Sequence, residues 1–422
     1  MSRVLVDSGV SWLGKIPDSW STCRVKNKFL FHKIIAKEKS VNYDRIALTL
    51  NGVIKRDKDD SSGLQPDNYN GYQIVYKDDL IFKLIDLENV NTSRIGKSEY
   101  EGITSPAYIV LTDKCNTRYS LYYFLNMWYQ EIFNNIGGDG VRSAINKDDL
   151  LKVSFINAPI DEQNKIADYL DKQCKKINEI INDNNHEIEL LEEYKKTLIT
   201  EVITSGLNKN STFKESQISW MGKIPSHYEV VTLKRLGTAR NGLSYSPGEV
   251  ADNGILVLRS SNIQNNKLSL NDNVYVKKEI NECLLLKEND LLICSRNGSK
   301  NLIGKNILIN KDMEGQTFGA FMCVYRSKYN KYIRYVLNSH IFDYYLANFL
   351  TSTINQLTTS NLYSIKIPFT YNIEEQEKII KYLDKQCSKL DRVIEYRKQI
   401  IEKLEEYNKS LIFECVTGKR EV

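Results

Sequence analysis

The sequence predicts an α+β protein made of two related halves, each a compact mixed domain followed by one long helix. Two repeats indicate the duplication. The segment EQNKIADYLDKQC at 162–174 returns as EQEKIIKYLDKQC at 375–387, with ten of thirteen positions identical and an offset of 213. The motif SWLGKIP at 11–17 returns as SWMGKIP at 219–225. A single duplication of about half the chain predicts a pseudo-twofold protein rather than a solenoid, whose repeats are much shorter.

Each long repeat opens a segment with the heptad periodicity of a coiled coil. Asp161 is a candidate cap for the first helix, and Asn372 with Glu375 has the N-x-x-E pattern of a capping box for the second. Gly206 and Gly418 are signals for the two C-terminal ends. Each helix is expected to run for about 40 residues, or about 60 Å. The apolar seam positions are Ile177, Ile181, Ile188, Leu191 and Leu198 in the first helix, and Leu390, Ile394, Ile401, Leu404 and Leu411 in the second.

The two seams are most simply buried against each other within one chain. Two alternatives are that each seam packs on its own domain, or that it forms a coiled coil with an outside partner. Polar residues occupy matching seam positions, Asn184 with Arg397 and Lys195 with Asn408. Such residues lower stability but fix register and partner.

The segments between the helices predict compact α+β domains. Strand-like runs include YQIVY at 72–76, DLIF at 79–82, GILVL at 254–258 and DLLIC at 290–294, with Gly-containing turn signals between such runs. We expect a first domain at 1–158, a central helix at 159–206, a linker and second domain at 207–372, and a distal helix at 373–422.

The two domains share little sequence. GITSPAYIVL at 102–111 aligns with GQTFGAFMCV at 315–324 at the same offset of 213, and elsewhere the domains differ almost completely. One scaffold with two different surfaces predicts two readers for two different targets.

The composition limits the possible classes of protein. The 41% hydrophobic and 26% charged residues are ordinary for a soluble globular protein, and no apolar run approaches the roughly 18–20 residues of a membrane span. Eight cysteines without CxxC spacing predict free thiols in a reducing cytoplasm. The net charge of +5 permits nucleic-acid binding without requiring it.

Motifs for catalysis are missing from the sequence. It has four His, no HExxH or Cys/His metal spacing, no GxSxG, and neither of the usual loops of an amino-methyltransferase. NTSRIGKS at 91–98 ends like a phosphate-binding loop, but Asn91 replaces the first glycine. PIDEQNK at 159–165 loosely resembles a metal nuclease, yet carboxylates in a first helical turn are better explained by the helix dipole. We expect no enzyme activity, no metal and no cofactor on this chain.

Basic and amide side chains in loops of both halves predict DNA contacts. Arg reads guanine, Asn and Gln read adenine, and Lys holds phosphates. We assign Arg296 to base reading and Lys305 to phosphate contact. A solvated loop is the alternative for any single residue, and a weaker alternative for the set because both halves show it. The candidates are Asn51, Lys55, Arg56, Lys83, Arg94, Lys97 and Arg142 in the first half, and Arg259, Asn262, Gln264, Arg296, Asn297, Lys300 and Lys305 in the second.

The duplicated SW-x-GKIP motif, the two dissimilar domains and the helix openings IDEQNKI and IEEQEKI resemble the specificity subunit of type I restriction–modification systems. The resemblance covers essentially the whole chain. It implies two target recognition domains, each followed by a conserved helix, with the helices packed antiparallel. It also implies a chain without an active site that binds double-stranded DNA at two half-sites around a fixed gap.

The partners implied by this resemblance are two methyltransferase subunits, which carry S-adenosylmethionine, and endonuclease/translocase subunits in the full complex. Two alternatives from other classes remain. One is a catalytic DNA methylase or nuclease with fused recognition domains. The other is a coiled-coil scaffold that binds no DNA.

Overall fold

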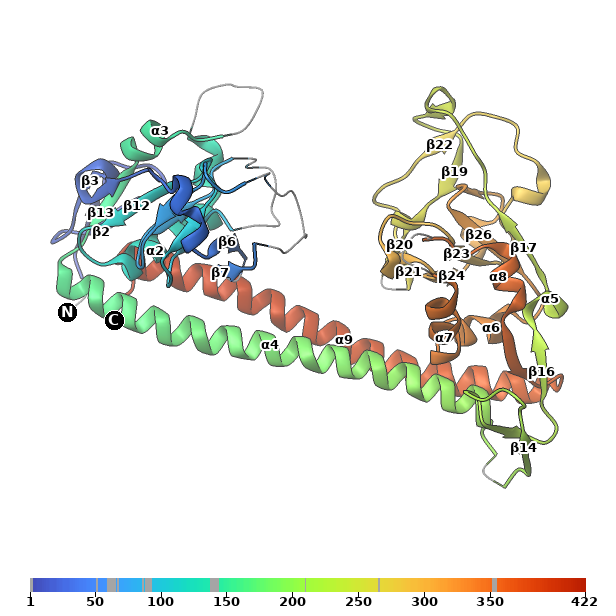
Figure 1. Ribbon diagram of the computed structural model, residues 1–422. Coiled ribbons are helices and arrows are strands. Elements are labelled where there is room, and N and C mark those ends of the chain that lie inside the picture. The colour runs from blue at the N-terminus through green and yellow to red at the C-terminus, as the bar shows by residue number, and fades with distance from the viewer. Residues whose placement is uncertain are drawn as a thin grey trace. The chain divides into compact units, whose positions relative to one another are not determined.

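The computed structural model describes residues 3–50, 52–58, 66, 68–85, 87, 93–136, 144–208, 210–264, 266–350 and 355–422 (Figure 1). The chain divides into two compact units. Unit 1 comprises Met1–Asn184 and Lys398–Val422, and unit 2 comprises Asn185–Arg397. Each long helix therefore contributes one part to unit 1 and the other part to unit 2.

The two long helices lie inside the ranges predicted for them. Helix α4 spans Ile160–Ser205 and helix α9 spans Ile373–Val416 (Figure 1). Gly206 and Gly418 follow them with left-handed φ values of 70° and 69°, which a residue without a Cβ adopts at no steric cost. Both C-terminal signals read from the sequence are confirmed.

The N-terminal ends of the helices follow the predictions only in part. Asn372 caps α9, because its side chain accepts the N–H of Glu375 at 3.2 Å. The carboxylate of Glu375 accepts a hydrogen bond from Thr370 instead of completing the capping box. Asp161 lies inside the first turn of α4, so its prediction as a cap is wrong. Its charge there still complements the helix dipole.

Unit 1 buries the first part of α4 together with the last part of α9. Ile177 and Leu411 belong to one buried cluster, and Ile181 and Leu404 pack on its edge. Seam residues of both helices thus share the core of unit 1 with the globular domain.

In unit 2 the helices run antiparallel. Lys195 of α4 pairs with Asp391 of α9 at 2.6 Å, and Glu187, earlier in α4, pairs with Arg397, later in α9. The antiparallel arrangement is therefore confirmed within this unit. The remaining seam residues are buried or half-buried: Ile188, Leu191, Leu198, Leu390 and Ile394 in unit 2, and Ile401 in unit 1.

The globular part of unit 1 contains two main sheets, ordered β10-β9-β12-β4 and β5-β8-β11-β6-β7. The elements are β1 (Leu5–Asp7), β2 (Lys15–Pro17), β3 (Ser21–Arg24), α1 (Val25–Lys28), β4 (Phe29–Phe31), β5 (Ile34–Ile35), β6 (Arg45–Thr49), β7 (Gly52–Arg56), β8 (Gln73–Val75), β9 (Leu80–Phe82), β10 (Ile95–Lys97), β11 (Gly102–Thr104), β12 (Ile109–Asp113), α2 (Thr117–Tyr129), α3 (Lys147–Lys152) and β13 (Ser154–Asn157), with short 3-10 turns at Lys37–Asn42 and Ile132–Asn135.

The globular part of unit 2 has main sheets ordered β17-β26-β23-β24 and β18-β22-β19-β25. Its elements are β14 (Phe213–Glu215), β15 (Lys223–Pro225), β16 (Glu229–Thr232), α5 (Leu233–Leu236), β17 (Thr238–Asn241), β18 (Val250–Ala251), β19 (Ile255–Leu258), β20 (Ile263–Gln264), β21 (Lys267–Leu268), β22 (Tyr275–Val276), β23 (Leu291–Cys294), β24 (Asn306–Leu308), β25 (Thr317–Phe318), β26 (Met322–Arg326), α6 (Asn330–Val336), α7 (His340–Phe349), α8 (Thr359–Ser364) and β27 (Lys366–Phe369), with 3-10 turns at Pro247–Glu249, Ser260–Asn262, Glu282–Leu284, Lys300–Leu302 and Lys311–Met313.

The two globular parts share the strand order of one main sheet and a parallel strand pair of the other. The order β4-β12-β9-β10 of unit 1 matches β17-β26-β23-β24 of unit 2, and the parallel pair β6–β11 matches β19–β25. Strands β9 and β23 lie inside their sheets and are buried along their whole length, which explains their unbroken apolar sequences. The four strand-like runs read from the sequence form β8, β9, β19 and β23, and the α+β class is confirmed.

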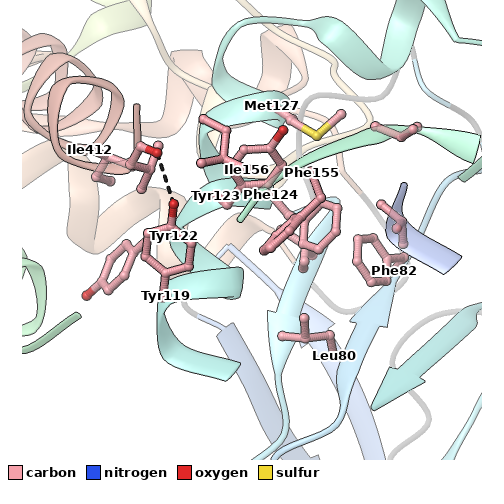
Figure 2. Close-up of a cluster of buried hydrophobic side chains, with 14 of the residues drawn as sticks. Leu80, Phe82, Tyr119, Tyr122, Tyr123, Phe124, Met127, Phe155, Ile156 and Ile412 are labelled. Carbon is pink, nitrogen blue, oxygen red and sulfur yellow. Dashed lines mark hydrogen bonds between the residues drawn. The ribbon is translucent and has the colours of Figure 1, made fainter. Parts of the chain in front are cut away.

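The core of unit 1 is aromatic. Phe82 of β9, Tyr123 and Phe124 of α2, and Phe155 of β13 pack edge to face (Figure 2). Helix α2 also carries Tyr119, whose hydroxyl donates to the carbonyl of Val416 at 3.1 Å. The end of α9 is thereby joined to helix α2.

Candidate nucleic-acid interface

In each unit, hydrogen bonds to a repeated aspartate attach the globular domain to a long helix. In unit 1, Asp171 of α4 accepts hydrogen bonds from Arg118 at 2.7 Å and from Tyr122 at 2.8 Å, both on α2. In unit 2, Asp384 of α9 accepts from Arg334 and Tyr335 on α6. Asp171 and Asp384 are related by the offset of 213. The repeat therefore keeps an acceptor for an Arg–Tyr pair.

A repeated glutamate fixes the start of each helix. Glu162 of α4 accepts the indole N–H of Trp20 at 3.0 Å, and Glu375 of α9 accepts the hydroxyl of Tyr228 at 3.2 Å. Trp20 and Tyr228 each follow an SW-x-GKIP motif and are separated by its offset of 208. The motif and the helix start thus form one joint in each unit. The constant spacing of these two aromatic residues was the sequence signal for the joint.

A repeated glutamine completes each joint. Gln163 donates its side-chain amide to the carbonyl of Ala158 at 2.7 Å, and Gln376 donates to that of Thr370 at 2.6 Å. Both side chains are buried, so each satisfies a backbone acceptor that water does not reach. The EQ pair at the start of both repeats therefore has a structural role.

In unit 2 the exposed candidate with the clearest geometry is Arg296. It follows β23, and its guanidinium lies 5.3 Å from the ring centre of Phe321. Arg259 forms an ion pair with Asp272 at 2.8 Å, and the exposed Gln264 donates to the carbonyl of Ser261. Arg296 and Gln264 therefore reach the surface, whereas Arg259 is already neutralised.

Other candidates in unit 2 hold loops together. Asn297 donates to the hydroxyl of Ser260 at 2.9 Å. Lys300 donates to the carbonyl of Leu350, and Lys305 to that of Ile263 at 2.8 Å. Lys300 is exposed and can turn to a phosphate by breaking one hydrogen bond. Lys305 is half-buried, which weakens its assignment to phosphate contact.

Asn262 and Arg94 are corrections to the candidate set. Asn262 is fully buried, and its amide donates to the carbonyl of Ser269 at 2.9 Å. Arg94 is 2% exposed and donates to the carbonyl of Ile85. A side chain enclosed by its own domain does not reach a base edge. Neither residue is therefore a candidate for DNA contact.

In unit 1 the remaining candidates are paired or half-buried. Lys55 forms an ion pair with Asp44 at 2.5 Å, and this hydrogen bond lowers the pKa of Asp44 and raises that of Lys55. Lys97 pairs with Asp78 at 3.0 Å and also with Glu99. The half-buried candidates are Arg56 and Lys83, while Asn51 and Arg142 lie outside the described residues.

Sequence reasoning missed Phe321. This side chain is 59% exposed in the turn between β25 and β26, beside Arg296. The only sequence signal was an aromatic residue in a turn containing glycine, at a position where the apolar pattern predicts burial.

The described residues offer neither a metal site nor a helix that could span a membrane. Within the described part of the chain, no group of three or more His, Cys, Asp and Glu side chains is arranged to hold a metal ion. Its helices also include none that is long and apolar enough to cross a membrane.

Comparison with known proteins decides the family. The family model for the type I restriction modification DNA specificity domain matches residues 22–190 and 225–406, one match for each half. The chain belongs to this family. The family assignment confirms the role in DNA target recognition that the sequence predicted.

Relatives and a solved structure agree with this assignment. The chain is 26% identical to the type I restriction enzyme MjaVIII specificity subunit of Methanocaldococcus jannaschii, over 82% of this chain and 80% of the relative. It is 24% identical to a putative type I restriction enzyme MjaX specificity subunit of the same organism, over 96% and 95%. A chain solved in work on assembly and conformational transition of the type I R-M system has a TM-score of 0.65 at 13% identity, covering 95% of this chain and 98% of the other.

Proposed function

We propose that this chain is the non-catalytic specificity subunit of a type I restriction–modification complex in the cytoplasm. It reads an asymmetric bipartite target in double-stranded DNA, one half-site per globular domain. It binds two methyltransferase subunits, which hold S-adenosylmethionine, and endonuclease subunits join through them. The observation that supports this proposal is that a repeated aspartate, Asp171 or Asp384, accepts from an Arg–Tyr pair in each unit, while the two domains differ in their exposed side chains.

The absence of catalysis in the proposal is supported by what the repeated carboxylates do. Glu162 and Asp171 are engaged by Trp20 and Arg118, and their counterparts in unit 2 are engaged in the same way. Glu162 belongs to the segment 159–165 that loosely resembles a metal nuclease, and it acts as a hydrogen-bond acceptor in a joint, as does Asp171 outside that segment.

The two methyltransferase subunits have matching docking positions in this proposal. Ile180 and Val393 are related by the offset of 213, as are Tyr194 and Tyr407, and all four are exposed. Unit 1 contains Ile180 with Tyr407, and unit 2 contains Val393 with Tyr194. Each unit therefore offers one aliphatic and one tyrosine side chain, a composition that protein interfaces favour.

In unit 2, Tyr194 of α4 and Val393 of α9 lie at about the same height along the two paired helices. Lys195 and Asp391, which form an ion pair, are the close chain neighbours of Tyr194 and Val393 respectively. A second exposed pair, Leu190 and Tyr396, extends the apolar surface of this unit. Two equivalent surfaces suit two copies of one partner better than a single partner.

The test of target reading is an exchange of one domain. Residues 226–372 are replaced by the second domain of another family member, and modified adenines are mapped across a genome carrying the complete system. We expect one half-site to change while the other half-site and the gap stay the same. A change in both half-sites would contradict the two-reader proposal.

The test of catalysis uses the purified chain alone. We expect no methyl transfer and no cleavage without partner subunits, and methyl transfer by the pure chain would support the catalytic alternative. Salt-dependent DNA binding by the assembled complex separates the proposal from the scaffold alternative, since DNA affinity falls steeply with salt when phosphates are contacted.

A further inference from the structure

Phe321 is held in place by its backbone while its side chain points to solvent. The turn Gly319–Met322 joins β25 to β26, and the N–H of Met322 donates to the carbonyl of Gly319 at 2.8 Å. The carbonyl of Phe321 accepts three hydrogen bonds: the N–H of Ser295 at 2.9 Å, the N–H of Arg296 at 3.0 Å, and the hydroxyl of Ser295 at 2.9 Å. Hydrogen bonds from Ser295 and Arg296 therefore fix the orientation of the Phe321 backbone.

The other side of the turn is fixed as well. Gly242 donates its N–H to the carbonyl of Met322 at 3.1 Å, and Leu243 donates to Phe318 at 2.7 Å. A Cβ at Gly242 would lie 2.3 Å from the carbonyl oxygens of Phe318 and Gly319, so only glycine permits this close approach. An exposed phenylalanine on an immobilised turn loses little conformational entropy when it binds a ligand.

Arg296 gives this turn its charge. Its guanidinium stacks on the Phe321 ring at 5.3 Å, and a β-bridge between Arg296 and Gln356 fixes its backbone. A planar cation beside an exposed aromatic ring matches a base stack flanked by phosphates. It is a poor match for an apolar protein groove, where the guanidinium loses its water without gaining a partner.

The same turn in unit 1 lacks the exposed ring. The N–H of Tyr108 donates to the carbonyl of Ser105, so Ser105–Tyr108 corresponds to Gly319–Met322 and Ala107 corresponds to Phe321. The sequence alignment had placed Tyr108 opposite Phe321, one residue away. Ala107 is exposed, like Phe321, but it has no ring to stack on a base.

We propose that Phe321 inserts against a base step in the half-site read by unit 2 and partly unstacks it, with Arg296 contacting the adjacent base edge. This inference rests on the proposed function, since it assumes that unit 2 faces DNA. Apolar side chains inserted between base pairs open the stack and favour steps that deform easily. Phe321 therefore adds specificity for a deformable step, whereas the equivalent turn of unit 1 has Ala107 and no ring to insert.

The experiment uses the full chain assembled with its methyltransferase subunits. Duplexes carry the target found by adenine mapping, with 2-aminopurine placed at successive positions of the half-site assigned to unit 2 by the domain exchange. With the parent complex and with Phe321→Tyr, we expect the fluorescence to rise on binding at one step. With Phe321→Ala we expect no rise and an affinity about 5- to 150-fold lower, the range given by about 1–3 kcal/mol per stacked base.

Matched controls keep the test specific. Phe213 is 42% exposed in β14 of the same unit, and Phe213→Ala should change neither affinity nor fluorescence. An unchanged fluorescence rise and affinity in Phe321→Ala would overturn the inference. Loss of methyltransferase subunits with intact target affinity would also overturn it, by showing a protein contact. If the parent complex does not distinguish the target from a scrambled duplex, the proposed function itself fails.

Discussion

Unit 1 and unit 2 join a globular domain to a long helix through the same repeated carboxylates, but they present different side chains at the equivalent turn. Asp171 and Asp384 accept from the same kinds of donor in both units, whereas Ala107 in one turn is replaced by Phe321 in the other. The same helix segment occurs in both units, so the same carboxylate acceptors can hold the domain in each. The side chains of Ala107 and Phe321 are exposed, so packing within the described part of the chain does not require them to be alike.

The largest expected effect tests whether the joints are equivalent. Leu170 and Leu383 are related by the offset of 213, and both are fully buried in the cores of their units. We expect Leu170→Ala and Leu383→Ala each to lower the free energy of unfolding of its own unit by about 2–5 kcal/mol. Hydrogen exchange measures this unit by unit, because a chain with two units is not expected to unfold in one step.

The exposed lysines at matching positions provide the control. Lys172→Ala and Lys385→Ala should change stability by less than about 0.5 kcal/mol. A loss confined to one of the two leucine variants would show that the two helices are not mounted equivalently.

The second prediction concerns a buried aspartate whose side-chain partner differs between the units. Asp290 is held by Arg326, whose Nε lies 2.7 Å from its carboxylate, while Asp79 pairs with His32 at 3.0 Å. Asp79 also accepts the hydroxyl of Thr112 at 2.6 Å and a backbone N–H, whereas Asp290 keeps only a backbone N–H once the cation is removed.

We therefore expect Arg326→Ala to destabilise unit 2 by about 2–3 kcal/mol, below the value for a fully buried pair because Arg326 is partly exposed. His32→Ala should cost unit 1 about 1 kcal/mol. Urea unfolding followed by a probe in each unit measures both, and Arg326→Lys should restore part of the loss. Equal costs in the two units would contradict this account of the two carboxylates.

The third prediction sharpens the docking comparison. Tyr194→Ala and Tyr407→Ala should each weaken one of two methyltransferase contacts by about tenfold, or about 1.4 kcal/mol. Native mass spectrometry at limiting concentration should then show one bound subunit instead of two. The matched controls are Glu192→Ala and Glu405→Ala, which change exposed helix positions related by the same offset. Loss of both subunits from a single tyrosine variant would rule out independent docking.

The smallest effect concerns the duplicated cysteines. Burial raises the pKa of Cys174 and of Cys387 from the ordinary value of 9.0 to about 11. At pH 8 almost all of each thiol is protonated, so iodoacetamide should modify the exposed Cys115 first. Peptide mass mapping over time measures the order. Equally fast labelling of Cys174 in the folded chain would contradict its burial.

These two thiols also predict a dependence of stability on pH. The folded state favours the neutral thiol, so the stabilisation is complete below pH 9 and is lost as the pH rises from 9 towards about 11. Both units should show it over this range, and Cys174→Ser with Cys387→Ser should reduce it, since other buried thiols with raised pKa values, such as Cys415, remain.

The periodic features of this chain were predictable because they are local. The heptads, the helix-ending glycines Gly206 and Gly418, and the buried strands β9 and β23 each depend on residues a few positions apart. The family assignment was predictable for a related reason, since its motifs are short and repeated at fixed offsets.

The surface was not predictable in the same way, because exposure depends on contacts between distant segments. Asn262 and Gln264 are two residues apart, yet one is enclosed by the 269–272 loop and the other is exposed. Arg94 has the composition of a DNA contact, but its side chain is buried and donates to the carbonyl of Ile85.

The sequence alone determined that the protein is a duplicated pair of helix-mounted domains, because a repeat is visible without knowing what each residue touches. The tertiary structure decided which polar residues form the joints and which reach outward. Glu162 needed Trp20 brought to 3.0 Å, and Phe321 needed a turn anchored by Ser295 and Gly242. Burial and hydrogen bonding between segments far apart in the chain are properties of the folded state, and no local pattern encodes them.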